Sequence, residues 1–182
     1  REAIRKMTDT SIIPAADKRS LASQAAIHGN SASFNFCQHG TTHFFSWHRA
    51  YLYFFETICR DLAGDETFGL PYWNWNKNPD IPTAFLQAGS PLQRLRINPN
   101  LGTVNAVSDA TLTTIMSDPN YLTFRPQFEG SPHNVVHGAI GGIFATGASA
   151  TDPLFWAHHC MVDYCWYKWN IELENDNPDD PE

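Results

Sequence analysis

The chain has 182 residues, of which 42% are hydrophobic and 17% charged, as in a soluble globular domain with its own core and not in a disordered segment. Its formal net charge of −7 argues against a nucleic-acid partner, which requires a basic face. No apolar run approaches the roughly 20 residues of a membrane-spanning helix, so we expect no membrane association. No signal peptide is visible, but the first residue is Arg and not Met, so a cytoplasmic and a secreted location both stay open.

Two helices are predicted in the first third of the chain. Residues Ala15–His28 are rich in Ala, Leu, Lys and Gln, and the Gly29 that follows is a typical helix end. Residues from about Thr42 to Leu62 place large apolar side chains mostly three or four positions apart, which is the period of a helix with one buried face. Gly64 is expected to end this second helix.

The remaining two thirds of the chain contain loops and two more helices. Frequent Pro, Gly and Asn between Gly69 and Asn120 predict long loops with one or two short helices. Ser131–Pro132 supplies an N-cap and a first-turn proline directly before His133. Asp152–Pro153 does the same for a long helix that we expect to reach about Glu174.

No strand pattern is strong, and at most residues 69–75 and 141–145 are expected to pair locally. An acidic tail from about residue 173 is expected to fray. The fold predicted from these elements is one domain over residues 1–182, mainly α, built as a small helical bundle with long loops.

The eight histidines cluster along the chain, and their spacing indicates metal ligands. His133 and His137 are four residues apart, which places both imidazoles on one helix face about 5–6 Å apart at Cβ. His159 on the next helix can complete a three-histidine site, with Asp163 one turn further to orient a ligand. His158 is rotated by about 100° on that helix, so we expect it to point elsewhere and to be structural.

The N-terminal half offers a second set of histidines. His28 ends the first helix, His48 lies within the second, and His39 belongs to the loop before it. His43 competes with His39, because the two are four apart and spacing alone does not decide between them. Sites made only of imidazoles suit copper, zinc, iron or nickel, with copper(II) bound most tightly.

At these residues the sequence resembles the tyrosinase family of type 3 dicopper proteins. The segment HGTTHFFSWHRAYLYFFE, His39–Glu56, resembles the copper A signature of that family, and DPLFWAHHCMVD, Asp152–Asp163, resembles its copper B signature. PHNVVHGAIGG at Pro132–Gly142 and LPYWNW at Leu70–Trp75 are also similar to family sequences, although Asn74 stands where Asp is common. The resemblance implies a site for two copper ions between the helices.

Residue by residue, the resemblance implies one ligand set for each copper ion. Copper A takes His28, His39 and His48, copper B takes His133, His137 and His159, and His43 falls at a spacer position. Cys37, two residues before His39, implies a thioether bond to that histidine; the alternative is a buried free thiol.

Three further residues occupy positions that affect catalysis in the family. Glu129 and Asn134 imply a base that holds a water and takes the proton of a phenol; the alternatives are a helix-end charge and a solvated side chain. Gly138 implies an open substrate entrance. No lid domain follows Trp169, so we expect no built-in cover over the coppers.

The implied activity is that of a tyrosinase, a monooxygenase and oxidase whose reactants are O2 and small phenolic substrates. A catechol oxidase or an o-aminophenol oxidase would use the same site without hydroxylating monophenols, and a haemocyanin-like oxygen carrier is a further alternative from another class. Whether a copper-delivery partner is needed stays open.

Overall fold

The structure is a computed structural model that describes residues 1–178. It is mainly helical, and within these residues the only β pairing consists of isolated bridges, Gly29 with Phe34 and Asp80 with Asn100. The expected local pairing of residues 69–75 with 141–145 is therefore not found in the part of the chain described. The helices are α1 (Glu2–Thr8), α2 (Leu21–His28), α3 (Phe44–Ala63), α4 (Asp109–Met116), α5 (Tyr121–Phe128), α6 (Val135–Ile140) and α7 (Leu154–Tyr167).

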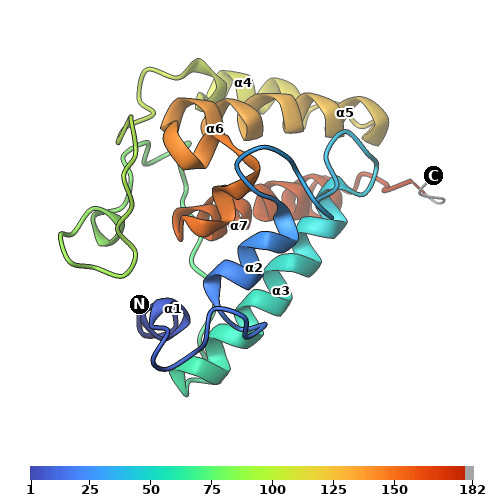
Figure 1. Ribbon diagram of the computed structural model, residues 1–182. Coiled ribbons are helices and arrows are strands. Elements are labelled where there is room, and N and C mark those ends of the chain that lie inside the picture. Colours follow the sequence, from blue (N-terminus) through green and yellow to red (C-terminus); the bar gives the residue numbers. More distant parts are fainter. Residues whose placement is uncertain (179–182) are drawn as a thin grey trace.

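Figure 1 shows how these helices are arranged in space. Helices α4, α5 and α6 lie along the top of the view, α2 and α3 run below them, and α7 lies in the middle. The long connection between α3 and α4, drawn in green, contains only the short turns Thr83–Phe85 and Asn105–Val107. The prediction of a helical bundle with long loops is confirmed.

The predicted ends of α3 at Gly64 and of α2 at His28 hold, whereas the predicted start of α2 is wrong. Gly64 adopts a left-handed conformation (φ 68°) directly after α3, as expected of a glycine that ends a helix. Helix α2 begins at Leu21 and not at Ala15, because the Ser20 hydroxyl accepts a hydrogen bond from the Ser23 amide and caps the helix there. The residues before Ser20 form turns.

Helices α5 and α6 meet at the predicted start before His133. Helical turns run from α5 through the π-helical stretch Glu129–Asn134 into α6, and they are interrupted at Ser131, whose backbone is extended (φ −149°, ψ 116°). Helix α5 itself was not predicted, because Pro126 lies inside it and Pro is rare in helix interiors.

Helix α7 continues as a π-helical stretch, and part of the tail contacts α7. The Asp152 carboxylate accepts a hydrogen bond from the Leu154 amide at the start of α7, and π-helical turns continue from Lys168 to Glu172. The Trp166 indole donates to the Asn177 side chain in the tail. Residues 179–182 of the tail lie outside the described residues.

The core is built largely from aromatic rings between α3, α5 and α7. Phe55 of α3 stacks on Trp156 of α7 with ring centroids 3.4 Å apart. Phe124 of α5 stacks on Trp169 at 4.4 Å and on Phe45 of α3 at 5.4 Å. These contacts fix the three helices that surround the histidines. No helix in the described residues is long and apolar enough to cross a bilayer.

Candidate metal centre

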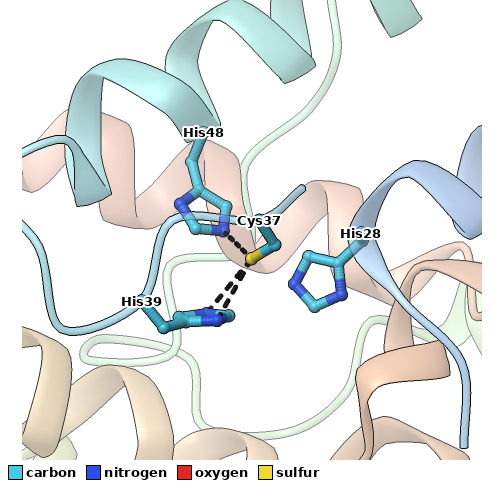
Figure 2. Close-up of side chains that lie close together, drawn as sticks. All are labelled: His28, Cys37, His39 and His48. Atoms are coloured by element: carbon cyan, nitrogen blue, oxygen red, sulfur yellow. Dashed lines mark hydrogen bonds between the residues drawn. The ribbon is translucent and has the colours of Figure 1, made fainter. Parts of the chain in front are cut away.

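The histidines expected to bind metal come together in two groups. His28 at the end of α2, His48 in α3, and Cys37 and His39 in the loop between them form the first group, with their potential ligand atoms all within 4.8 Å of one another. Figure 2 shows these three imidazoles arranged around the sulfur of Cys37. The second group contains His133, His137, His158 and His159, whose potential ligand atoms also lie within 4.8 Å of one another.

The two groups face each other across a short distance. The rings of His48 and His159 stack with centroids 4.4 Å apart, and the centroids of His39 and His133 are 5.6 Å apart. His43, the residue before α3, belongs to neither group, so the structure brings His39 and not His43 to the site. Two adjacent sites of this kind can hold two metal ions with a small molecule between them.

Backbone carbonyl groups fix the protonation of several rings. The Nδ1 atoms of His28, His48 and His137 each lie 2.7 Å from a carbonyl oxygen, which belongs to Gly147, Phe44 and Phe144 respectively. A carbonyl oxygen only accepts, so each Nδ1 carries the proton and each Nε2 keeps a lone pair. This tautomer is the one that binds a metal through Nε2.

His133 is held in the same way by two oxygens. Its Nδ1 lies 3.0 Å from the Asn134 side-chain oxygen and 3.3 Å from the Glu129 carbonyl oxygen. The Nε2 atoms of His28 and His133 are buried without a hydrogen-bond partner in the described residues. A buried nitrogen lone pair without a partner is costly, and a metal ion would satisfy it, so the residues present fit a metal centre.

His158 lies inside the second group but is oriented against metal binding. Its ring centroid is 4.8 Å from that of His137, so the expectation that it points elsewhere is wrong. The indole N–H of Trp75 donates to His158 Nδ1 at 3.1 Å. Because an indole N–H can only donate, Nδ1 must accept, and the single proton of the neutral ring then sits on Nε2. That ring has no lone pair left for a metal.

Burial keeps the histidines neutral. It lowers the pKa of His39 to about 4 and that of His137 to about 3, with smaller contributions from neighbouring histidines. It lowers the pKa values of His48, His133 and His159 well below the ordinary value of 6.5 for the same reason. Imidazole must be neutral to bind a metal, so the site is ready for ligation at neutral pH.

Cys37 lies against the edge of the His39 ring. Its sulfur is 3.1 Å from His39 Nδ1 and 3.6 Å from His39 Nε2, so it faces the Cε1 carbon between the two nitrogens. Burial raises the pKa of the Cys37 thiol, which therefore stays protonated at neutral pH. The geometry is compatible with a bond between the sulfur and this carbon.

Glu129 and Asn134 have separate partners. The Glu129 carboxylate accepts a hydrogen bond from the Gly40 amide at 2.7 Å and another from Arg125 at 2.5 Å. The Asn134 side chain is engaged with His133. The contact with Gly40 was not predicted, because Gly40 and Glu129 are 89 positions apart and no local spacing relates them. Arg125 lies four residues before Glu129, a spacing that brings side chains together on a helix, but this helix was not predicted.

A cavity of about 230 Å³ opens onto both groups. Gly138 lies in its wall, and a Cβ added there would meet nothing within 4 Å. Among residues 1–178, no lysine, arginine, aspartate or glutamate lines this cavity. The lining consists of His28, Phe34, His39, His133, Asn134, His137, Gly138, Phe144, Ala145, Thr146 and Ser149.

The segment 142–151 connects the two groups and was missed in the sequence. It supplies the carbonyl oxygens that orient His28 and His137, one ligand candidate from each group. Gly147 packs against the loop after α2 so closely that an added Cβ would lie 2.4 Å from the Ser33 carbonyl oxygen. Only glycine fits there, and a glycine between Thr146 and Ala148 is the sole sequence signal of this contact.

Comparisons with known proteins agree with this site. The family model described as the common central domain of tyrosinase matches residues 18–103 and 92–172. Tyrosinase HcTyr1 of Hahella sp. (strain CCB-MM4) is 32% identical over 82% of this chain and 41% of its own length. The latent polyphenol oxidase of Prunus armeniaca is 29% identical over 86% of this chain and 36% of its own.

Among solved structures, active aurone synthase, a polyphenol oxidase, superposes with a TM-score of 0.77 at 25% identity. The match covers 100% of this chain and 69% of that structure. The chain thus spans less than half the length of the two curated relatives, and the shared part contains both histidine groups.

Proposed function

Because this chain belongs to the tyrosinase family, we propose that it is a type 3 copper oxidase that uses dioxygen to hydroxylate monophenols at the ortho position and to oxidise o-diphenols to o-quinones. The observation that carries the proposal is the pair of facing histidine groups. Backbone carbonyls hold Nδ1 of His28, His48 and His137, and Nε2 of His28 and His133 is buried without a partner among the described residues. Residues 1–182 would form one catalytic domain.

Six imidazoles would hold the two copper ions, three for each. When bound, the coppers would supply the electron transfer to dioxygen, while the protein binds and orients the substrate and excludes bulk water. His158 is left out because of its tautomer, and His43 because of its distance from both groups. The proposed ligands are His28, His39 and His48 for copper A and His133, His137 and His159 for copper B.

Glu129 and Asn134 are proposed to handle the phenol proton. A phenol has a pKa of about 10 and arrives protonated at neutral pH, so it must lose a proton to bind a metal. A carboxylate has roughly four lone-pair sites, and the contacts with Gly40 and Arg125 use two of them, which leaves room for a water. Asn134, which lines the cavity, would help to hold that water near the substrate.

Cys37 is proposed to form a thioether bond with Cε1 of His39. The sulfur–carbon bond replaces the S–H and C–H bonds, so two protons and two electrons are lost, and dioxygen is the acceptor available in the proposed reaction. The bond would fix the only proposed ligand that no helix carries.

Catechol oxidase is the second candidate, and one observation favours it. Both oxygens of the Glu129 carboxylate already accept hydrogen bonds, which weakens its action as a base. O-aminophenol oxidation would use the same site.

The test is a spectrophotometric assay of the copper-loaded protein with tyrosine, catechol and o-aminophenol as separate substrates. We expect turnover of tyrosine and catechol. Turnover of catechol alone identifies a catechol oxidase, and turnover of o-aminophenol alone identifies an o-aminophenol oxidase. Reversible oxygen binding without any oxidation would contradict the proposal and indicate a carrier.

A further inference from the structure

The loop that carries His39 needs support from outside itself. His28 and His48 are held by α2 and α3, whereas His39 lies in the connection between them. Gly40 and Thr42, which follow His39, contact Tyr121 of α5 and Glu129, the first residue of the π-helical stretch after α5.

One face of α5 makes these contacts. Tyr121, Arg125 and Glu129 are spaced by four residues, so their side chains lie along the same side of the helix and its continuation. The Tyr121 hydroxyl donates to the Thr42 carbonyl oxygen at 2.7 Å. The Glu129 carboxylate accepts from the Gly40 amide at 2.7 Å, so the loop is held on the residue after His39 and again two residues later.

Arg125 completes this arrangement. Its guanidinium donates to the Glu129 carboxylate at 2.5 Å, and the side chains of the pair are only 14% and 8% exposed. Charge-assisted hydrogen bonds are short and directional, and the low dielectric of the interior strengthens them. Arg125 therefore fixes the carboxylate in the orientation that meets the Gly40 amide.

Helix α5 itself is held in place by aromatic packing. Phe124, between Tyr121 and Arg125, is fully buried and stacks on both Trp169 and Phe45. The carbonyl oxygen of Glu129 also lies 3.3 Å from Nδ1 of His133, so the same residue contacts His133 and the residue that follows His39.

We propose that the face formed by Tyr121 and Arg125 of α5 and by Glu129 directly after it positions His39 for copper A, with Tyr121 and Arg125 as positioning residues that touch neither metal nor substrate. This role rests on the proposed function, because it assumes that copper A sits on His39. The cause is geometric, because the loop holds His39 in place only while the Thr42–Tyr121 and Gly40–Glu129 hydrogen bonds persist.

The experiment compares Arg125→Met and Tyr121→Phe with a matched control, Arg60→Met. Arg60 pairs with Glu56 at 2.6 Å, and the other oxygen of Glu56 accepts from the Leu70 amide at 2.8 Å, so the same arrangement recurs near the end of α3 farther from His48. The control loses the same kind of ion pair, here partly exposed, together with a hydrogen bond to the Phe68 carbonyl oxygen, without touching the His39 loop.

Two readouts are taken on each variant. In the copper-free protein, hydrogen exchange of the Gly40 amide should be about tenfold faster in Arg125→Met, because its charged acceptor is no longer oriented. In the loaded protein, one of two copper ions should be bound ~10–100-fold more weakly against a chelator in Arg125→Met and in Tyr121→Phe, the range typical for lost partners of metal ligands. Arg60→Met should match the wild type in both.

Wild-type Gly40 exchange and wild-type copper affinity in the folded variants would overturn the proposal. If Arg125→Met does not fold, the milder Tyr121→Phe decides alone through its copper affinity. A wild-type protein that binds no copper would contradict the proposed function instead, and Gly40 exchange in copper-free protein would still decide whether α5 holds the loop.

Discussion

Two neighbouring histidines of α7 should give opposite results when each is replaced by alanine. His158 accepts the Trp75 indole hydrogen bond and is fully buried, so it serves packing and hydrogen bonding. His159 has a buried Nδ1 without a partner among the described residues, and its Nε2 lies 3.4 Å from Nε2 of His137. We expect His158→Ala to lose stability and keep copper, and His159→Ala to lose one copper ion.

The structure gives the size of the stability effect. His158→Ala leaves the Trp75 N–H unpaired in the interior, which costs ~1–3 kcal/mol, and it opens a cavity that adds to this. A total of ~2–4 kcal/mol corresponds to a fall in Tm of roughly 5–15 °C for a chain of this size. His159→Ala removes a buried Nδ1 that has no partner among the described residues, so this variant should lose less stability in the copper-free state than His158→Ala.

The assay combines thermal unfolding of the copper-free proteins with elemental analysis of the loaded ones. His158→Ala should show the lower Tm and two copper ions per chain, and His159→Ala the higher Tm and one copper ion. A folded His158→Ala protein with a single copper would refute the tautomer argument, because it would make His158 a ligand.

Four other outcomes follow from the site. The intact mass should be two hydrogens below the sequence mass, with a peptide map joining Cys37 to His39; a Cys37 that alkylates freely in active protein contradicts the thioether. Glu129→Gln should lower monophenol turnover ~10²–10⁴-fold with a much smaller loss for catechol, as measured by steady-state kinetics, whereas equal losses would make the residue structural. Gly147→Ala places a Cβ 2.4 Å from a backbone oxygen and should lower the copper A affinity ~10–100-fold by equilibrium dialysis, while Gly69→Ala, whose Cβ meets nothing closer than 3.8 Å, should not. The copper-free protein should lose stability as the pH falls from 6.5 toward 4, because the folded pKa of His39 is about 4 and the unfolded chain takes up the proton first; a Tm that does not change between pH 7 and pH 5 contradicts this.

The part of the site that follows from local sequence was predictable. The spacing of His133 and His137 and the apolar period of α3 depend on neighbours within one or two helical turns, and the structure agrees with both. His39 was chosen over His43 only through the family signature, since the two histidines are four residues apart and their spacing does not decide between them.

What depends on distant contacts was not predictable. His158 and His159 are adjacent in α7, yet both rings lie in the second group, which helical rotation alone did not predict. The proton on Nε2 of His158 follows only from the hydrogen bond with Trp75, which is 83 residues away in the sequence. The support of His39 by Arg125 and Glu129 joins residues 89 positions apart, and no local pattern encodes it.

Helix α5 shows how a local rule fails. Pro126 inside an eight-residue helix argues against that helix from propensity alone, since proline removes one backbone hydrogen bond. The aromatic stack of Phe124 with Trp169 and Phe45 stabilises it from outside. Tertiary packing overrides intrinsic propensity here.

The count of copper ions per folded chain, taken together with the absorption of the oxygenated protein, tests the central claim most directly. Six histidines in two facing groups predict two copper ions per chain and a strong oxygen-dependent band in the near ultraviolet. One copper per chain, or tightly bound zinc with no band that depends on oxygen, would contradict the assignment of this site as a dicopper centre.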